Sequence, residues 1–133
     1  MVKIETFDKY QLDVDYDILE CSQFFKNLLE FNQDSDEIIP LNDSSCSKKN
    51  IELLIDIISN NKDDITFNEY CELIKISNFL EIKYLLKKSS KEIAKSIKEC
   101  TNEDELKELF GEMRELTSEE EEDIKKEYDK ICG

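Results

Sequence analysis

In short stretches of the first 41 residues, apolar and polar positions alternate with a period of two. Residues 2–7 and 11–15 both alternate, and a polar pair separates them, so the pattern predicts a β-hairpin. Residues 37–41 predict a third short strand after the polar loop at 32–36. Because Pro40 has no backbone N–H to donate, this strand should lie at a sheet edge or end there.

Beyond these strands, apolar residues recur at spacings of three and four, which is typical of helices. The helix over residues 50–59 should bury a stripe of four side chains, namely Ile51, Leu54, Ile55 and Ile58. The pattern predicts a short helical turn and then six helices, at 18–21, after 22, at 50–59, after 66, at 83–98, at 101–110 and after 117.

Polar residues mark the starts of several of these helices. Thr66 and Thr117 are each followed three residues later by glutamate, which is the form of a capping box. Ser22 and residues 101–104 are also predicted caps, and Gly111 is expected to end the helix before it.

Early strands and late helices predict an α+β fold, a small three-stranded sheet covered by helices, and not a wound α/β sheet. The chain has 133 residues, two glycines and one proline, which suits one domain with an appendage. The composition shifts after Glu99, and residues 101–133 carry more than half of the net charge of −15. We therefore expect one domain at 1–100 and a two-helix tail at 101–133.

The tail helices are poor in apolar residues and would be marginal alone. Their apolar side chains could form a platform for the helices of a partner, they could pack back onto the domain, or the tail could be partly disordered. The residues concerned are Leu106, Leu109, Phe110, Ile124, Tyr128 and Ile131.

Composition argues against most chemistry. The negative charge disfavours nucleic acid and anionic membranes as ligands, and no apolar stretch is long enough to cross a bilayer. Without histidine there is no Ser–His or Cys–His pair, and two glycines cannot make a phosphate-binding loop. The five cysteines are too widely spaced for zinc and are expected to be reduced, with Cys71 and Cys100 packed as small apolar groups. A non-enzymatic binding module without cofactor or metal is favoured.

Several segments, taken in their order along the chain, resemble the Skp family of adaptors that link cullin scaffolds to F-box proteins. The segment 78–86, Asn-Phe-Leu-Glu-Ile-Lys-Tyr-Leu-Leu, is similar to a characteristic family segment. The other segments are Pro40-Leu41, Ile93-Ala94 to Ile97, Leu106 to Phe110, and residues 116–122. The resemblance implies a BTB/POZ-like domain at 1–100 that binds a cullin, and F-box-binding helices at 101–133.

The resemblance also implies a role for individual residues. The implied cullin contacts are Pro40, Leu41, Asn78 and Phe79. The implied F-box contacts are Ile97, Leu106, Leu109, Phe110, Ile124, Tyr128 and Ile131. The alternative is that Phe79, Leu109 and Phe110 belong to the core. Family members act in the cytoplasm and nucleus, and the free chain is expected to form homodimers.

Three departures from the family pattern stand out. No tryptophan occurs near the end of the last helix, Asn102 replaces a common proline, and Phe79 replaces tyrosine. Three other classes stay open: an elongin C-like adaptor, a BTB oligomerisation module and an acidic calcium-binding helical protein. The 33 residues at 101–133, with their two capped helices, argue against elongin C. Residues 119–123 lack the loop and glycine of a hand-type calcium site.

Overall fold

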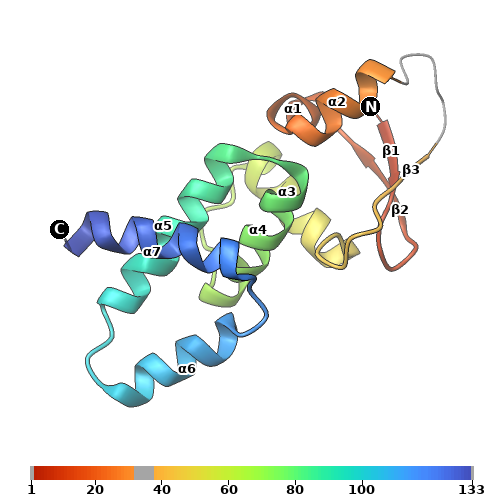
Figure 1. Ribbon diagram of the computed structural model, residues 1–133. Helices are drawn as coiled ribbons and strands as arrows, with labels where there is room; N and C mark the ends of the chain where they lie inside the picture. Colours follow the sequence, from red (N-terminus) through yellow and green to blue (C-terminus); the bar gives the residue numbers. More distant parts are fainter. Residues whose placement is uncertain (1, 32–37, 133) are drawn as a thin grey trace. The chain divides into compact units, whose positions relative to one another are not determined.

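The computed structural model describes residues 2–31 and 38–132, which form a three-stranded sheet and seven helices (Figure 1). The strands are β1 (Val2–Glu5), β2 (Gln11–Val14) and β3 (Ile39–Pro40). The helices are α1 (Tyr16–Cys21), α2 (Gln23–Phe31), α3 (Lys48–Asn60), α4 (Phe67–Leu80), α5 (Lys83–Lys98), α6 (Glu103–Met113) and α7 (Ser118–Cys132). The expected α+β class is confirmed. The loop predicted at 32–36 and the start of the strand predicted at 37–41 lie outside the described residues.

The chain folds into two compact units. The first contains Met1–Asp64 and Phe79–Ile82, and the second contains Ile65–Asn78 and Lys83–Gly133. This division follows structure and differs from the expected functional division at residue 100, which stays a prediction. In the described part of the chain, no helix is both long and apolar enough to cross a membrane.

In the first unit, the sheet has the order β2-β1-β3. β1 pairs antiparallel with β2, with Val2 opposite Val14, and parallel with β3, with Ile4 opposite Ile39. β3 is an edge strand that ends at Pro40, as its missing N–H predicts. The hairpin prediction is also confirmed.

The turn between β1 and β2 is held by side chains. The Thr6 hydroxyl donates to Asp8 Oδ1 over 2.7 Å, and the backbone N–H of Lys48, at the start of α3, donates to the same oxygen over 2.9 Å. The hydrogen bond from Thr6 is the main cause that holds the pKa of Asp8 below its ordinary value. The turn is thereby tied to the first turn of α3.

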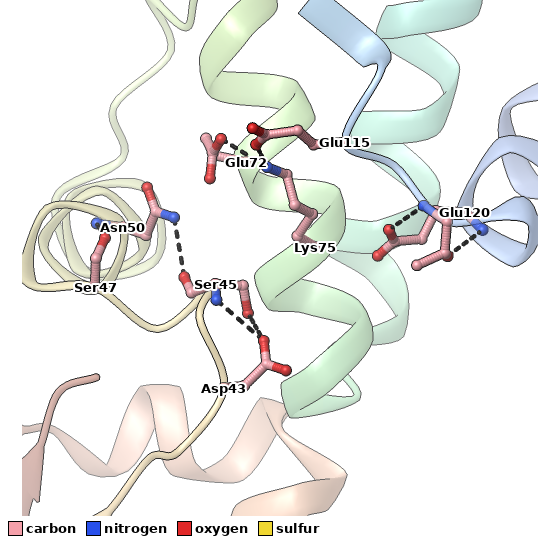
Figure 2. Close-up of polar contacts among 9 residues, drawn as sticks. Asp43, Ser45, Ser47, Asn50, Glu72, Lys75, Glu115 and Glu120 are labelled. Atoms are coloured by element: carbon pink, nitrogen blue, oxygen red, sulfur yellow. Dashed lines mark hydrogen bonds and ion pairs between the residues drawn. The ribbon is translucent and has the colours of Figure 1, made fainter. Parts of the chain in front are cut away.

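Helix α3 buries a face different from the one predicted. Leu53 and Ile57 are buried along with Ile51 and Leu54, whereas Ile55 and Ile58 are only half-buried. The buried face also contains Asn50, whose side-chain N–H donates to the carbonyl of Ser45 over 2.9 Å (Figure 2). This satisfied amide lets positions 50, 53, 54 and 57 face the core, a helical spacing that an apolar-only reading of the sequence misses.

Ser22 caps α2, as predicted. Its hydroxyl accepts a hydrogen bond from the N–H of Phe25 over 3.2 Å and donates to the carbonyl of Leu80 over 2.5 Å. One buried hydroxyl therefore starts α2 and ties it to the end of α4.

The second unit has its own apolar core, in which α7 packs against α5 (Figure 1). The buried members of this core are Cys71, Ile74, Ile93, Ala94, Met113, Leu116 and Ile124.

Two helix-start predictions in the second unit are confirmed. Thr66 and Glu69 exchange hydrogen bonds of 2.9 and 3.2 Å. Thr117 and Glu120 exchange bonds of 3.0 and 3.2 Å, and Figure 2 labels Glu120. The expected stop at Gly111 is wrong, because α6 continues to Met113. Gly111 does not take the left-handed conformation that ends helices, and burial of Met113 to 6% exposure favours the extra turn.

Candidate partner-binding groove

The second unit contains a groove of about 880 Å³ between the end of α5, the α5–α6 connection, α6 and α7. Its apolar wall and floor come from six side chains: Ile97, Leu106, Phe110, Met113, Ile124 and Tyr128. The remaining lining residues are Lys98, Cys100, Thr101, Asn102, Glu103, Arg114, Glu121 and Lys125. All of these lining residues lie within 97–128, so a local segment builds the groove.

Helix α6 is held at its two ends. At its start, the Asn102 side chain accepts from the N–H of Glu105 over 2.9 Å, and Glu105 in turn accepts from the N–H of Thr101 over 2.8 Å. At its end, Met113 enters the core of the second unit. Between these anchors, Leu106 stays half-buried and Phe110 is 50% exposed. The middle of α6 therefore presents apolar surface to the groove.

Helix α7 supplies the floor. Ile124 is 3% exposed and Tyr128 is half-buried. At the start of α7, Glu120 is only 4% exposed, and its two carboxylate oxygens accept from the N–H of Thr117 and, over 3.5 Å, from the side chain of Asn78. Because the helix N-terminus and these donors compensate the buried charge, α7 begins at a fixed position.

An ion-pair cluster holds the connection between α6 and α7. Lys75 on α4 contacts Glu72 over 2.9 Å and Glu115 over 3.3 Å (Figure 2). Burial acts to lower the pKa of Lys75, but hydrogen bonds and charges from Glu72 and Glu115 outweigh it, so the pKa is raised. The connection is thus tied to α4 by a charged amine.

Five of the seven predicted F-box residues line the groove. Leu109 is half-buried outside the groove lining, and Ile131 packs against the core of the second unit. The sequence analysis did not identify Met113 and Leu116 as core residues. The signal for Met113 was its spacing, because Leu106, Phe110 and Met113 lie four and three residues apart, as on one face of a helix that runs past Gly111. The groove-lining members are Ile97, Leu106, Phe110, Ile124 and Tyr128.

The predicted cullin residues have unequal exposure. Pro40 is exposed, but Leu41 is 1% exposed and its N–H donates to the carbonyl of Glu5 over 2.9 Å, so its side chain belongs to the core of the first unit. Phe79 is half-buried and its ring lies 5.0 Å from that of Phe24. Asn78 is half-buried and belongs to the second unit. Pro40, Asn78 and Phe79 keep side-chain surface that a partner could contact.

The cysteines are free thiols, and their surroundings differ. Burial raises the pKa of Cys46 and of Cys71 to about 12, which suits packing and not nucleophilic reactivity. Cys100 is half-buried at the groove, where burial also raises its pKa. Within residues 2–31 and 38–132, no group of three or more acidic or cysteine side chains is arranged to hold a metal ion.

Comparison with known proteins gives two concordant findings. Residues 83–131, which contain α5, α6 and α7, match the model of the Skp1 family dimerisation domain. Two relatives from Dictyostelium discoideum, SCF ubiquitin ligase complex proteins SKP1a and SKP1b, are each 29% identical over 151 aligned positions. Each alignment covers 96% of this chain and 93% of the relative. The chain is therefore similar to the Skp1 family dimerisation domain over its C-terminal helices, and to these two relatives over nearly its whole length.

Proposed function

We propose that this chain is the adaptor of an SCF-type ubiquitin ligase, which joins the N-terminal domain of a cullin to F-box substrate receptors. Such an adaptor is non-catalytic, and ligase activity belongs to the assembled complex. The observation that carries the proposal is the open apolar groove within the segment that matches the Skp1 family model.

The groove suits an apolar helix of a partner. Its volume of about 880 Å³ lies near the upper end of the roughly 300–1,000 Å³ found for ligand pockets, so several side chains can enter it. The exposed ring of Phe110 and the half-buried ring of Tyr128 both line the groove, and helices dock into such grooves through residues spaced three and four apart. We assign this groove to the F-box.

The cullin would contact surface provided by Pro40, Asn78 and Phe79. Leu41 would act indirectly, because its buried side chain fixes the end of the strand that presents Pro40. An elongin C-like role is less favoured, because the match to the Skp1 family model extends to residue 131. The functional division at residue 100, self-association of the free chain and a place in cytoplasm and nucleus stay predictions.

Truncation is a poor test of the F-box site. A chain that ends at Glu99 would lose α7, and Ile124 of α7 is part of the core that also contains Ile93 and Ala94. Loss of binding could then reflect loss of folding. Substitution of an exposed groove residue in the full chain separates the two effects.

The test compares Phe110→Ala with Tyr16→Ala, an aromatic residue that is 63% exposed on α1 and remote in sequence from the groove. Binding of an F-box segment is measured by isothermal titration calorimetry, with circular dichroism as the control for folding. Phe110→Ala should weaken binding at least about tenfold, as expected for an aromatic anchor, and Tyr16→Ala should leave it unchanged. Absence of F-box binding by the unmodified chain, or equal affinity of both variants, would reject the assignment.

A further inference from the structure

The charge around the groove differs from that of the rest of the chain. Three cations line it, Lys98, Arg114 and Lys125, against two carboxylates, Glu103 and Glu121. The chain as a whole has 18 basic and 33 acidic side chains. Arg114 is also the single arginine in the sequence. The groove is therefore locally basic in a strongly acidic protein.

Two of these cations are unpaired. Among residues 2–31 and 38–132, Arg114 and Lys125 make no ion pair, although a glutamate stands four residues before Lys125 on the same helix. Lys75, by contrast, is held by two carboxylates. Glutamate and lysine four residues apart readily pair on a helix, but Lys125 does not pair with Glu121. The charge of Lys125 is therefore available to a partner at the groove.

Stabilisation of helix ends does not account for all three cations. Lys98 lies in the last turn of α5 and donates to the carbonyl of Ile131 over 3.3 Å, and Arg114 follows the last residue of α6. Both positions favour a cation through the helix dipole. Lys125 lies in the middle of α7 (Ser118–Cys132), where the dipole gives no such benefit. Its place at the groove calls for another explanation.

We propose that the segment that docks in the groove carries acidic side chains beside its apolar ones, and that these carboxylates pair with Arg114 and Lys125. This inference rests on the proposed function and adds the charge of the partner to it. A guanidinium binds a carboxylate through two parallel hydrogen bonds, and this pairing is stronger where apolar side chains exclude water. Arginine is accordingly common among the residues that dominate binding at interfaces.

The overall negative charge of the chain does not oppose this pairing at close range. At physiological ionic strength the screening length is about 8 Å, so repulsion between an acidic partner and the distant carboxylates of the chain is largely screened. Contacts within the groove act over shorter distances and through partly desolvated groups. Short-range attraction therefore decides the preference.

The experiment uses two versions of one F-box segment, with either glutamate or glutamine at the positions that flank its apolar face. Each is titrated by fluorescence anisotropy into the unmodified chain, into Arg114→Gln/Lys125→Gln, and into Lys126→Gln. Lys126 is an exposed neighbour outside the groove lining and serves as the matched control. The acidic version should bind the unmodified chain about three- to tenfold more tightly than the neutral one, between the range of exposed pairs and that of buried interface pairs.

The double variant should lose this preference, and Lys126→Gln should retain it. Equal affinity of the two versions for the unmodified chain would overturn the inference and leave the F-box assignment intact. A preference that survives in the double variant would also overturn it. If neither version binds the unmodified chain, the proposed function and the inference both fail.

Discussion

Helices α6 and α7 start alike but end in different surroundings. Each begins with a polar residue that caps the backbone, and with a glutamate that accepts from a backbone N–H just before the helix, that of Thr101 in α6 and that of Thr117 in α7. In α7, Glu120, Ile124 and Glu127 are buried, whereas in α6 Met113 alone is. Local sequence signals therefore fix where each helix begins, while tertiary contacts decide whether its apolar face is closed.

The reason lies in what each helix packs against. Helix α7 lies along α5, where the small Ala94 beside Ile93 allows Ile124 to enter the core. Helix α6 has its two ends fixed, and its middle faces the groove with Leu106 half-buried and Phe110 half exposed. The open helix is thus the one that is suited to a partner.

The largest expected effect is on the closed helix. Ile124→Ala should lower the free energy of unfolding by about 2–5 kcal/mol, because it removes buried methyl groups and leaves a cavity in the second unit. Leu106→Ala is the matched change on α6 and should cost less than half as much, since that side chain is only half-buried. Urea denaturation followed by circular dichroism gives both values.

Equal losses of unfolding free energy in the two variants would contradict this difference between α6 and α7. That result would mean that Leu106 is as well packed as Ile124 and that the groove closes in the free chain. A smaller m-value in either variant would instead indicate a change in how much surface unfolding exposes, and the two free energies could then not be compared directly.

Where elements begin and end was largely predictable from sequence. The hairpin, the edge position of Pro40 and the caps at Ser22, Thr66 and Thr117 all rest on local backbone chemistry, which the sequence displays directly. The end of α6 was not, because glycine stops a helix only when it adopts a left-handed conformation. There the distant contact of Met113 outweighs the local signal.

The site was predictable in part. Spacing and resemblance together identified five residues of the groove wall and floor, but not its charge. Burial of Leu41 and of Glu120 also escaped prediction, because each depends on partners far along the chain: the carbonyl of Glu5 for Leu41, and Asn78 for Glu120. Glu120 lies in a run of four glutamates, and from sequence such a run is expected to be exposed to solvent.

A moderate effect is expected from the helix caps. Thr117→Ala should lower the free energy of unfolding by about 1 kcal/mol, because it removes the side-chain acceptor for the N–H of Glu120 at the buried start of α7. Asn102→Ala removes the corresponding acceptor from α6. Because α6 has fewer buried residues, loss of this cap should appear mainly as faster amide exchange within α6 and less as a change in the global free energy of unfolding. Equal global destabilisation by both variants would argue that α6 and α7 unfold as one cooperative unit.

The smallest effect should come from Gly111→Ala, and it should be stabilising. A Cβ placed at this position meets no atom within 4 Å, and the residue lies inside α6 with a helical backbone. Alanine restricts the unfolded chain more than glycine does, so we expect a gain of about 0.5–1 kcal/mol, confined largely to α6. Hydrogen exchange of the α6 amides should slow, while Glu108→Ala, an exposed change on the same helix, should leave them nearly unaltered. Faster exchange in Gly111→Ala would mean that α6 needs the freedom of glycine at this position. In that case the exposure of the apolar middle of α6 would depend on the backbone at Gly111 as well as on the lack of a helix packed against that face.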